Sequence, residues 1–82
     1  MNNEIAALRG RLAANEKVME AVGLSIDCTI EELRVLADKY EDKRCLETDK
    51  IFVLAKRLDG DVKHYRELSG QCDRLRKDLG EQ

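Results

Sequence analysis

The sequence lacks several features that other protein classes require. Its 82 residues include no proline and no tryptophan, and its aromatic residues are Tyr40, Phe52 and Tyr65. β-Sheet proteins are richer in aromatic residues, β-branched residues and turn signals, so this scarcity counts against a β fold. No apolar run approaches the roughly 18 residues of a membrane-spanning helix, and no basic start followed by an apolar stretch marks a signal peptide. We therefore expect a helical protein of the cytoplasm.

The cysteines are too few and too irregularly spaced to stabilise so short a chain. Cys28, Cys45 and Cys72 are an odd number and match neither a disulfide framework nor a CxxC zinc pattern. We therefore expect reduced thiols and no metal or other cofactor. One domain of 82 residues buries a modest fraction of its surface and usually needs disulfides, a metal or self-association. Self-association is the remaining route, and a homodimer is expected.

The charge balance limits the partners. Charged residues make up 39% of the chain, but 15 Lys and Arg nearly cancel 17 Asp and Glu, leaving a net charge of −2. Proteins that bind nucleic acid or anionic membranes normally carry a basic excess. The best case for nucleic acid is the cluster of Arg74, Arg76 and Lys77, which is interleaved with Asp73 and Asp78. A nucleic-acid-binding regulator that uses this cluster is the alternative function, and membrane binding is not expected.

Apolar residues recur at helical spacing. The first series alternates steps of three and four residues: Ile5, Leu8, Leu12, Asn15, Met19, Val22 and Ile26. It predicts a helix over about residues 3–22, in which Asn15 is either hydrated near an end or selects the pairing geometry. Gly23 is a helix stop signal, and Thr29 with Glu32 has the T-x-x-E spacing of a capping box. A turn at residues 23–29 is therefore predicted, and a second helix begins near residue 30.

A second series follows in a shifted register: Ile30, Leu33, Ala37, Tyr40, Arg44, Glu47, Ile51, Leu54, Leu58, Asp61, Tyr65, Leu68, Cys72, Leu75 and Leu79. Its polar members at 44 and 47 allow either a break at 44–49, with helices at about 30–46 and 49–79, or one continuous helix kinked near Gly60. We predict a single all-α domain over residues 1–82. It is a helical hairpin or a three-helix bundle with coiled-coil-like heptad packing, completed by oligomerisation.

The densest apolar stretch is IFVLA, at residues 51–55. In a helix that includes residue 45, Phe52 would stack on Cys45 and Val53 on Leu46, on a second face away from the seam of apolar residues. This pattern indicates either a bundle centre or a partner-binding patch anchored by Phe52. The predicted partner-binding residues are Phe52, Val53, Leu46 and Ile51. The predicted oligomer seam comprises Leu54, Leu58, Tyr65, Leu68, Leu75 and Leu79.

Catalysis has no support in the sequence. The one histidine, His64, has Asp61 and Glu67 three residues to either side, but a catalytic site also needs an orienting group and a pocket. The glycines form neither a GxGxxG motif nor a Walker loop. We expect a small non-enzymatic interaction module, an adaptor, inhibitor or assembly factor, similar in size and composition to accessory proteins of bacteria and phages.

Overall fold

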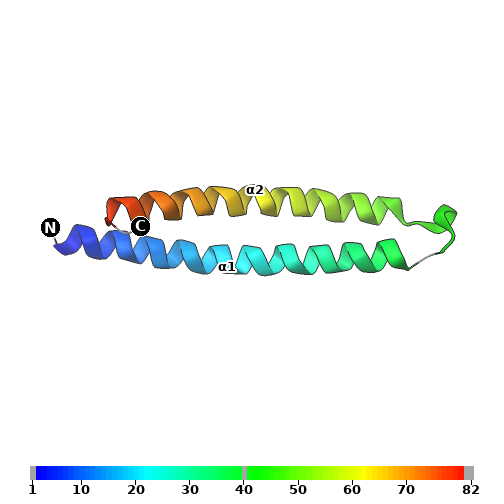
Figure 1. The fold of residues 1–82 in the computed structure, drawn as a ribbon, viewed down its shortest axis with the longest axis horizontal. Helices are drawn as coiled ribbons and strands as arrows, with labels where there is room; N and C mark the ends of the chain where they lie inside the picture. The colour runs from blue at the N-terminus through cyan, green and yellow to red at the C-terminus, as the bar shows by residue number, and fades with distance from the viewer. Residues whose placement is uncertain (1, 40, 81–82) are drawn as a thin grey trace.

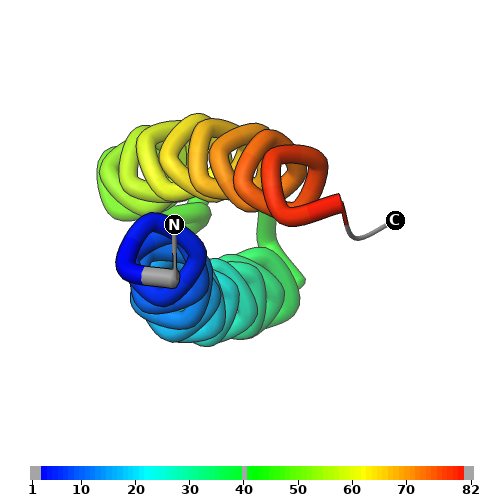
Figure 2. The backbone as a smooth tube through the Cα atoms, turned by 90° about the vertical axis from the view of Figure 1, so that its left-hand side faces the viewer, coloured from blue at the N-terminus to red at the C-terminus, as the bar shows by residue number. Residues whose placement is uncertain are grey.

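The computed structural model describes residues 2–39 and 41–80, which form one long helical hairpin (Figure 1). Helix α1 spans Asn2–Asp38, the short 3-10 helix η1 spans Lys43–Cys45, and helix α2 spans Thr48–Asp78. The two long helices run antiparallel, and the view along the hairpin shows them lying one above the other (Figure 2). The predicted all-α fold is confirmed in the described residues, which form a two-helix hairpin and not a three-helix bundle, although the chain does not reverse at the predicted turn.

Helix α1 continues through the turn that was predicted at residues 23–29, so that prediction is wrong. Among the described residues, a positive φ occurs at Gly80 and not at Gly23, which therefore has no left-handed stop conformation. Thr29 does not cap a second helix, because its Oγ1 donates a hydrogen bond to the carbonyl oxygen of Ser25 at 2.9 Å. Threonine makes this bond, to the residue four positions earlier, in the interior of a helix.

The predicted change of register at Ile30 is also wrong. The first series continues through Thr29, Leu33 and Leu36, which keep the steps of three and four residues and are buried or half-buried. Thr29 is 1% exposed although it is polar. Since its hydroxyl is satisfied within α1, burial against α2 leaves no unpaired donor.

The two long helices are separated earlier than the predicted break at 44–49, because α1 ends at Asp38 and α2 begins at Thr48. Helix α1 ends at Asp38 instead of near residue 46, and Tyr40, predicted to continue the series, lies outside the described residues. Asp42 begins η1, because its Oδ1 accepts a hydrogen bond from the backbone N–H of Arg44 at 3.0 Å. The Arg44 guanidinium donates to Oδ2 of the same carboxylate at 2.8 Å. These bonds, the side-chain one first, hold the pKa of Asp42 below its ordinary value.

The interface between α1 and α2 follows the long axis of a molecule that measures 64 × 18 × 14 Å. Its buried apolar residues within the described ranges are Leu12, Leu54, Leu68 and Cys72. Most residues of the predicted oligomer seam are buried or half-buried here, while Tyr65 is 37% exposed and its ring lies beside Gly23. The chain thus packs this seam against its own first helix. A contact of the seam with a second chain stays a prediction.

Polar contacts cross the same interface. The Ser25 hydroxyl donates to Oδ2 of Asp61 at 2.8 Å, so the inward aspartate of the predicted series has a partner on α1. At the end away from the loop, the Arg76 guanidinium lies 3.1 Å from a carboxylate oxygen of Glu16. Each contact requires one particular alignment of α1 with α2, and together they favour one register of the hairpin.

Candidate protein-interaction surface

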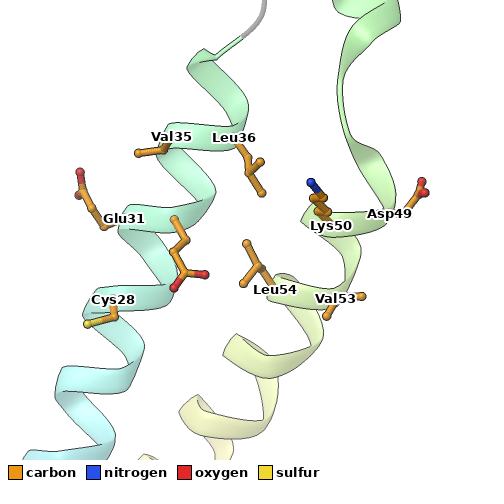
Figure 3. A pocket seen from close by; sticks show the side chains of 9 residues that line it. Cys28, Glu31, Val35, Leu36, Asp49, Lys50, Val53 and Leu54 are labelled. Atoms are coloured by element: carbon orange, nitrogen blue, oxygen red, sulfur yellow. The ribbon is translucent and has the colours of Figure 1, made fainter.

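A groove of about 800 Å³ opens beside the loop, between the last turns of α1 and the first turns of α2 (Figure 3). Figure 3 shows Leu36 and Leu54 pointing toward each other between the two helices. The lining residues are Cys28, Glu31, Glu32, Val35, Leu36, Asp49, Lys50, Val53 and Leu54. The lining surface is mostly apolar, and the groove is open to solvent along its length. An open apolar groove of this kind suits a helix of another polypeptide better than a small molecule, which usually binds in an enclosed cavity.

The groove is flanked by large apolar side chains that the chain leaves in water. Val35 on α1 is 58% exposed, and on α2 Val53 is 59% and Phe52 is 61% exposed. Leu46 and Ile51 are half-buried. The chain by itself therefore does not enclose residues 52 and 53 as a bundle centre would, whereas exposure is what a partner-binding patch requires. The binding role of these four predicted residues stays a prediction.

The helical stacking expected around Phe52 does not occur. Residues 46 and 47 are not helical and α2 begins at Thr48, so Cys45 and Leu46 are not on the same helix as Phe52 and Val53. The ring of Phe52 has a different neighbour, the Lys56 ammonium, which lies 5.2 Å from the ring centroid. Such a cation–π contact contributes about 0.5–1 kcal/mol at an exposed site. The ring remains 61% exposed beside this contact.

Charged side chains border the groove at its loop end. Glu47 accepts a hydrogen bond from the Lys50 ammonium at 2.8 Å, and its other carboxylate oxygen lies 3.9 Å from the Lys39 ammonium. The hydrogen bond from Lys50, with smaller contributions from the charges of both lysines, lowers the pKa of Glu47 below its ordinary value. The loop end of the groove is thus ionic, as the rim of a protein interface usually is.

A smaller, polar pocket of about 440 Å³ lies at the other end of the hairpin, lined by Arg11, Asn15, Gln71, Arg74, Leu75 and Asp78. Here Nδ2 of Asn15 donates to Oε1 of Gln71 at 3.3 Å, so Asn15 links α1 to α2. Of the basic cluster predicted for nucleic acid, Arg76 is engaged by Glu16 at 3.1 Å and by Asp73 at 3.4 Å. This pairing neutralises part of the cluster. Binding of nucleic acid there stays a prediction.

The histidine and the groups that could bind a metal ion were located in the described part of the chain. His64 is exposed, and no three His, Cys, Asp or Glu side chains of residues 2–39 and 41–80 are placed to hold a metal ion. Within the same ranges, neither long helix has an apolar segment capable of crossing a membrane.

Comparison with known proteins adds no relative from which a function could be transferred. No model of a known protein family matches the chain, and no curated protein or solved structure shows significant similarity to it. The α1 side of the groove was missed in the sequence, because the predicted turn at 23–29 separated Cys28 from the helix predicted over about 30–46. The signal was present, since Cys28, Glu31 and Val35 follow one another at steps of three and four residues.

Proposed function

We propose that this protein is a small non-enzymatic helical interaction module, acting as an adaptor, inhibitor or assembly factor through the apolar surface at the loop end of its hairpin. The observation that carries the proposal is the open apolar groove, with Val35, Val53 and the adjacent Phe52 each more than half exposed. Apolar anchors clustered at one place account for most of the binding energy of protein interfaces. Its three free thiols fit a reducing compartment such as the cytoplasm.

Self-association is the second part of the proposal. The chain exposes 6587 Å², whereas a compact monomer of 9.4 kDa exposes about 5,000 Å² by the usual scaling of surface with mass. The radius of gyration of 18.3 Å likewise exceeds the roughly 12 Å of a compact domain of this length. This excess surface favours a homodimer in which two hairpins pack as a helical bundle, with coiled-coil-like heptad packing along the seams.

The test of partner binding replaces Phe52, which is exposed and therefore dispensable for folding. Phe52→Asp is expected to weaken capture of a stoichiometric, identified partner by more than tenfold, as loss of an anchor residue does, while the helical circular dichroism is retained. The matched control is Ile5→Asp, which puts the same charge at a 46% exposed position at the far end of α1 and is expected to bind normally. The proposal is wrong if Phe52→Asp and Ile5→Asp bind alike, or if the protein instead retains a labelled DNA or RNA duplex at physiological salt.

A further inference from the structure

The outer surface of α1 carries a second series of residues at steps of three and four. Its members are Ala7, Gly10, Ala14, Lys17, Ala21, Leu24, Cys28, Glu31 and Val35, and all nine are exposed. Leu24 is 61% exposed and Val35 is 58% exposed. The outward side of a surface helix is normally polar, but here seven of the nine positions are small or apolar. We call this series the outer stripe.

We propose that a second copy of this chain docks on the outer stripe, with the two α1 helices antiparallel and a two-fold axis at Leu24. This inference rests on the self-association in the proposed function and adds its surface and its orientation. In such a pair, the residue a given number of positions before Leu24 faces the residue the same number after Leu24 in the other copy. Leu24 faces its own counterpart at the axis. An isologous contact of this kind closes as a dimer, because the outer stripe of each copy is covered by that of the other.

The charges of the outer stripe favour this arrangement. Lys17 and Glu31 are its two charged members and lie seven residues before and seven after Leu24. Antiparallel pairing about Leu24 therefore sets Lys17 of each copy opposite Glu31 of the other, giving two attractive pairs. Parallel pairing would instead set lysine against lysine and glutamate against glutamate, which is repulsive.

Side-chain size along the outer stripe is complementary under the same symmetry. Ala21 of one copy comes opposite the turn that carries Cys28 of the other, and Ala14 opposite the turn that carries Val35. The small residues thus lie in the first half of the stripe and the larger ones in the second half. Small residues facing larger ones allow two helices to approach closely along their length.

The length of the pairing and the total exposed surface leave room for a dimer interface. Residues 10–38 of α1 overlap in this pairing, a length of about 43 Å at 1.5 Å per residue. A stable interface buries about 800 Å² on each partner, which is about half of the surface that the chain exposes beyond a compact monomer of its mass. Cys28, Glu31 and Val35 belong both to the outer stripe and to the groove. The second copy therefore covers the α1 edge of the groove and leaves Phe52 free for another partner.

The decisive experiment exchanges the two charges and measures the dimer dissociation constant by sedimentation equilibrium. Lys17→Glu alone and Glu31→Lys alone each turn two attractive pairs into two repulsive ones, and each is expected to raise the dissociation constant by about tenfold. The double variant restores the pairs with their signs reversed and is expected to return close to the original value. The control for net charge is Lys63→Glu on α2. Lys63 pairs within its own helix with Asp59 at 2.9 Å, as Glu31 does with Arg34 at 3.6 Å, but it lies outside the outer stripe, so no change is expected.

A second variant tests the axis itself. Leu24→Glu would place two carboxylates against each other at the two-fold axis and is expected to weaken the dimer by more than a hundredfold, with helicity retained because residue 24 is exposed in the hairpin. A dimer that forms normally in the single charge variants, or that the double variant does not restore, overturns the outer-stripe pairing but leaves self-association standing. A chain that is monomeric at all concentrations overturns the pairing as well, and the interaction module is then judged by the Phe52 experiment.

Discussion

Replacing Gly23 by alanine tests the continuity of α1. Gly23 lies in the middle of the helix with no positive φ, at the place where the sequence predicted a helix end. An added methyl group would have Cε2 of Tyr65 as its nearest described neighbour at 3.5 Å, an ordinary van der Waals contact. The substitution therefore fits the structure without any movement of α2.

The expected effect is a gain in stability. Alanine is more favourable than glycine in a helix interior by about 0.8–1.0 kcal/mol, because it loses less backbone entropy on folding. The contact with the Tyr65 ring adds a small dispersion term of a few tenths of a kcal/mol at most. We expect Gly23→Ala to raise the free energy of unfolding by about 1 kcal/mol, which corresponds to an increase of about 4–8 °C in the melting temperature of a domain this size.

The measurement is thermal and urea unfolding followed by circular dichroism at one fixed protein concentration, since association would shift the melting point. The control is Gly80→Ala, where φ is 75° with no described atom within 4 Å. That variant is expected to be neutral or slightly destabilised, because alanine is strained in the left-handed region. If residues 23–29 formed a turn with Gly23 left-handed, Gly23→Ala would instead destabilise the protein by about 1 kcal/mol. A loss of stability in Gly23→Ala would therefore refute the continuous helix.

Two further predictions concern Thr29 and the loop. Thr29→Val is expected to leave the free energy of unfolding unchanged or to raise it by up to about 1 kcal/mol, because an apolar group of the same shape replaces a buried hydroxyl. Loss of a helix cap would instead cost about 0.5–2 kcal/mol in urea unfolding. The pKa values of Asp42 and Glu47 are lowered in the folded hairpin, so their stabilising effect is present above the ordinary carboxyl pKa of about 4 and is lost as the pH falls through the folded values. Melting temperatures measured from pH 7 to pH 2 are thus expected to fall as the pH falls, and to fall less steeply in Asp42→Asn than in the unmodified protein. An equally steep fall in both proteins would contradict the role of Asp42.

The sequence predicted the second half of the hairpin better than the first. Helix α2 was expected at about 49–79 and is found at Thr48–Asp78, because its apolar series continues through Leu54, Leu68 and Cys72, the positions that are buried. The spacing of these apolar residues follows from helix geometry alone, so it can be recognised in the sequence without knowing which element packs against α2.

The error in the first half came from local signals that have two meanings. Glycine can end a helix or provide room for a neighbour, and Gly23 lies beside the ring of Tyr65, 42 positions away in the sequence. The T-x-x-E spacing at Thr29 fits a capping box, but a threonine can also bond the carbonyl of its own helix. Which meaning applies is decided by the packing of α2 against α1, and a local motif contains no information about that contact.

For a related reason, the sequence indicated the α2 half of the candidate site but not the α1 half. Phe52 and Val53 were chosen from the density of apolar residues, a local property, and both are exposed as a binding patch requires. The α1 half of the groove was not predicted, since Cys28 and Val35 become neighbours of Val53 when the loop reverses the chain. With a turn placed at 23–29, the outer stripe would also have been divided between two helices.

The hairpin combines polar contacts between its two helices with large apolar side chains that stay exposed to solvent. Ser25 with Asp61, Asn15 with Gln71 and Glu16 with Arg76 link α1 to α2 through contacts that are exposed to solvent. Such contacts add little net stability but disfavour other alignments of two long helices. The chain keeps large apolar residues such as Leu24, Val35 and Phe52 in solvent. The polar contacts favour one alignment of the two helices, and the small apolar core stabilises the hairpin only in part. A helix of another polypeptide that covers these exposed apolar residues would therefore add to the stability of the hairpin.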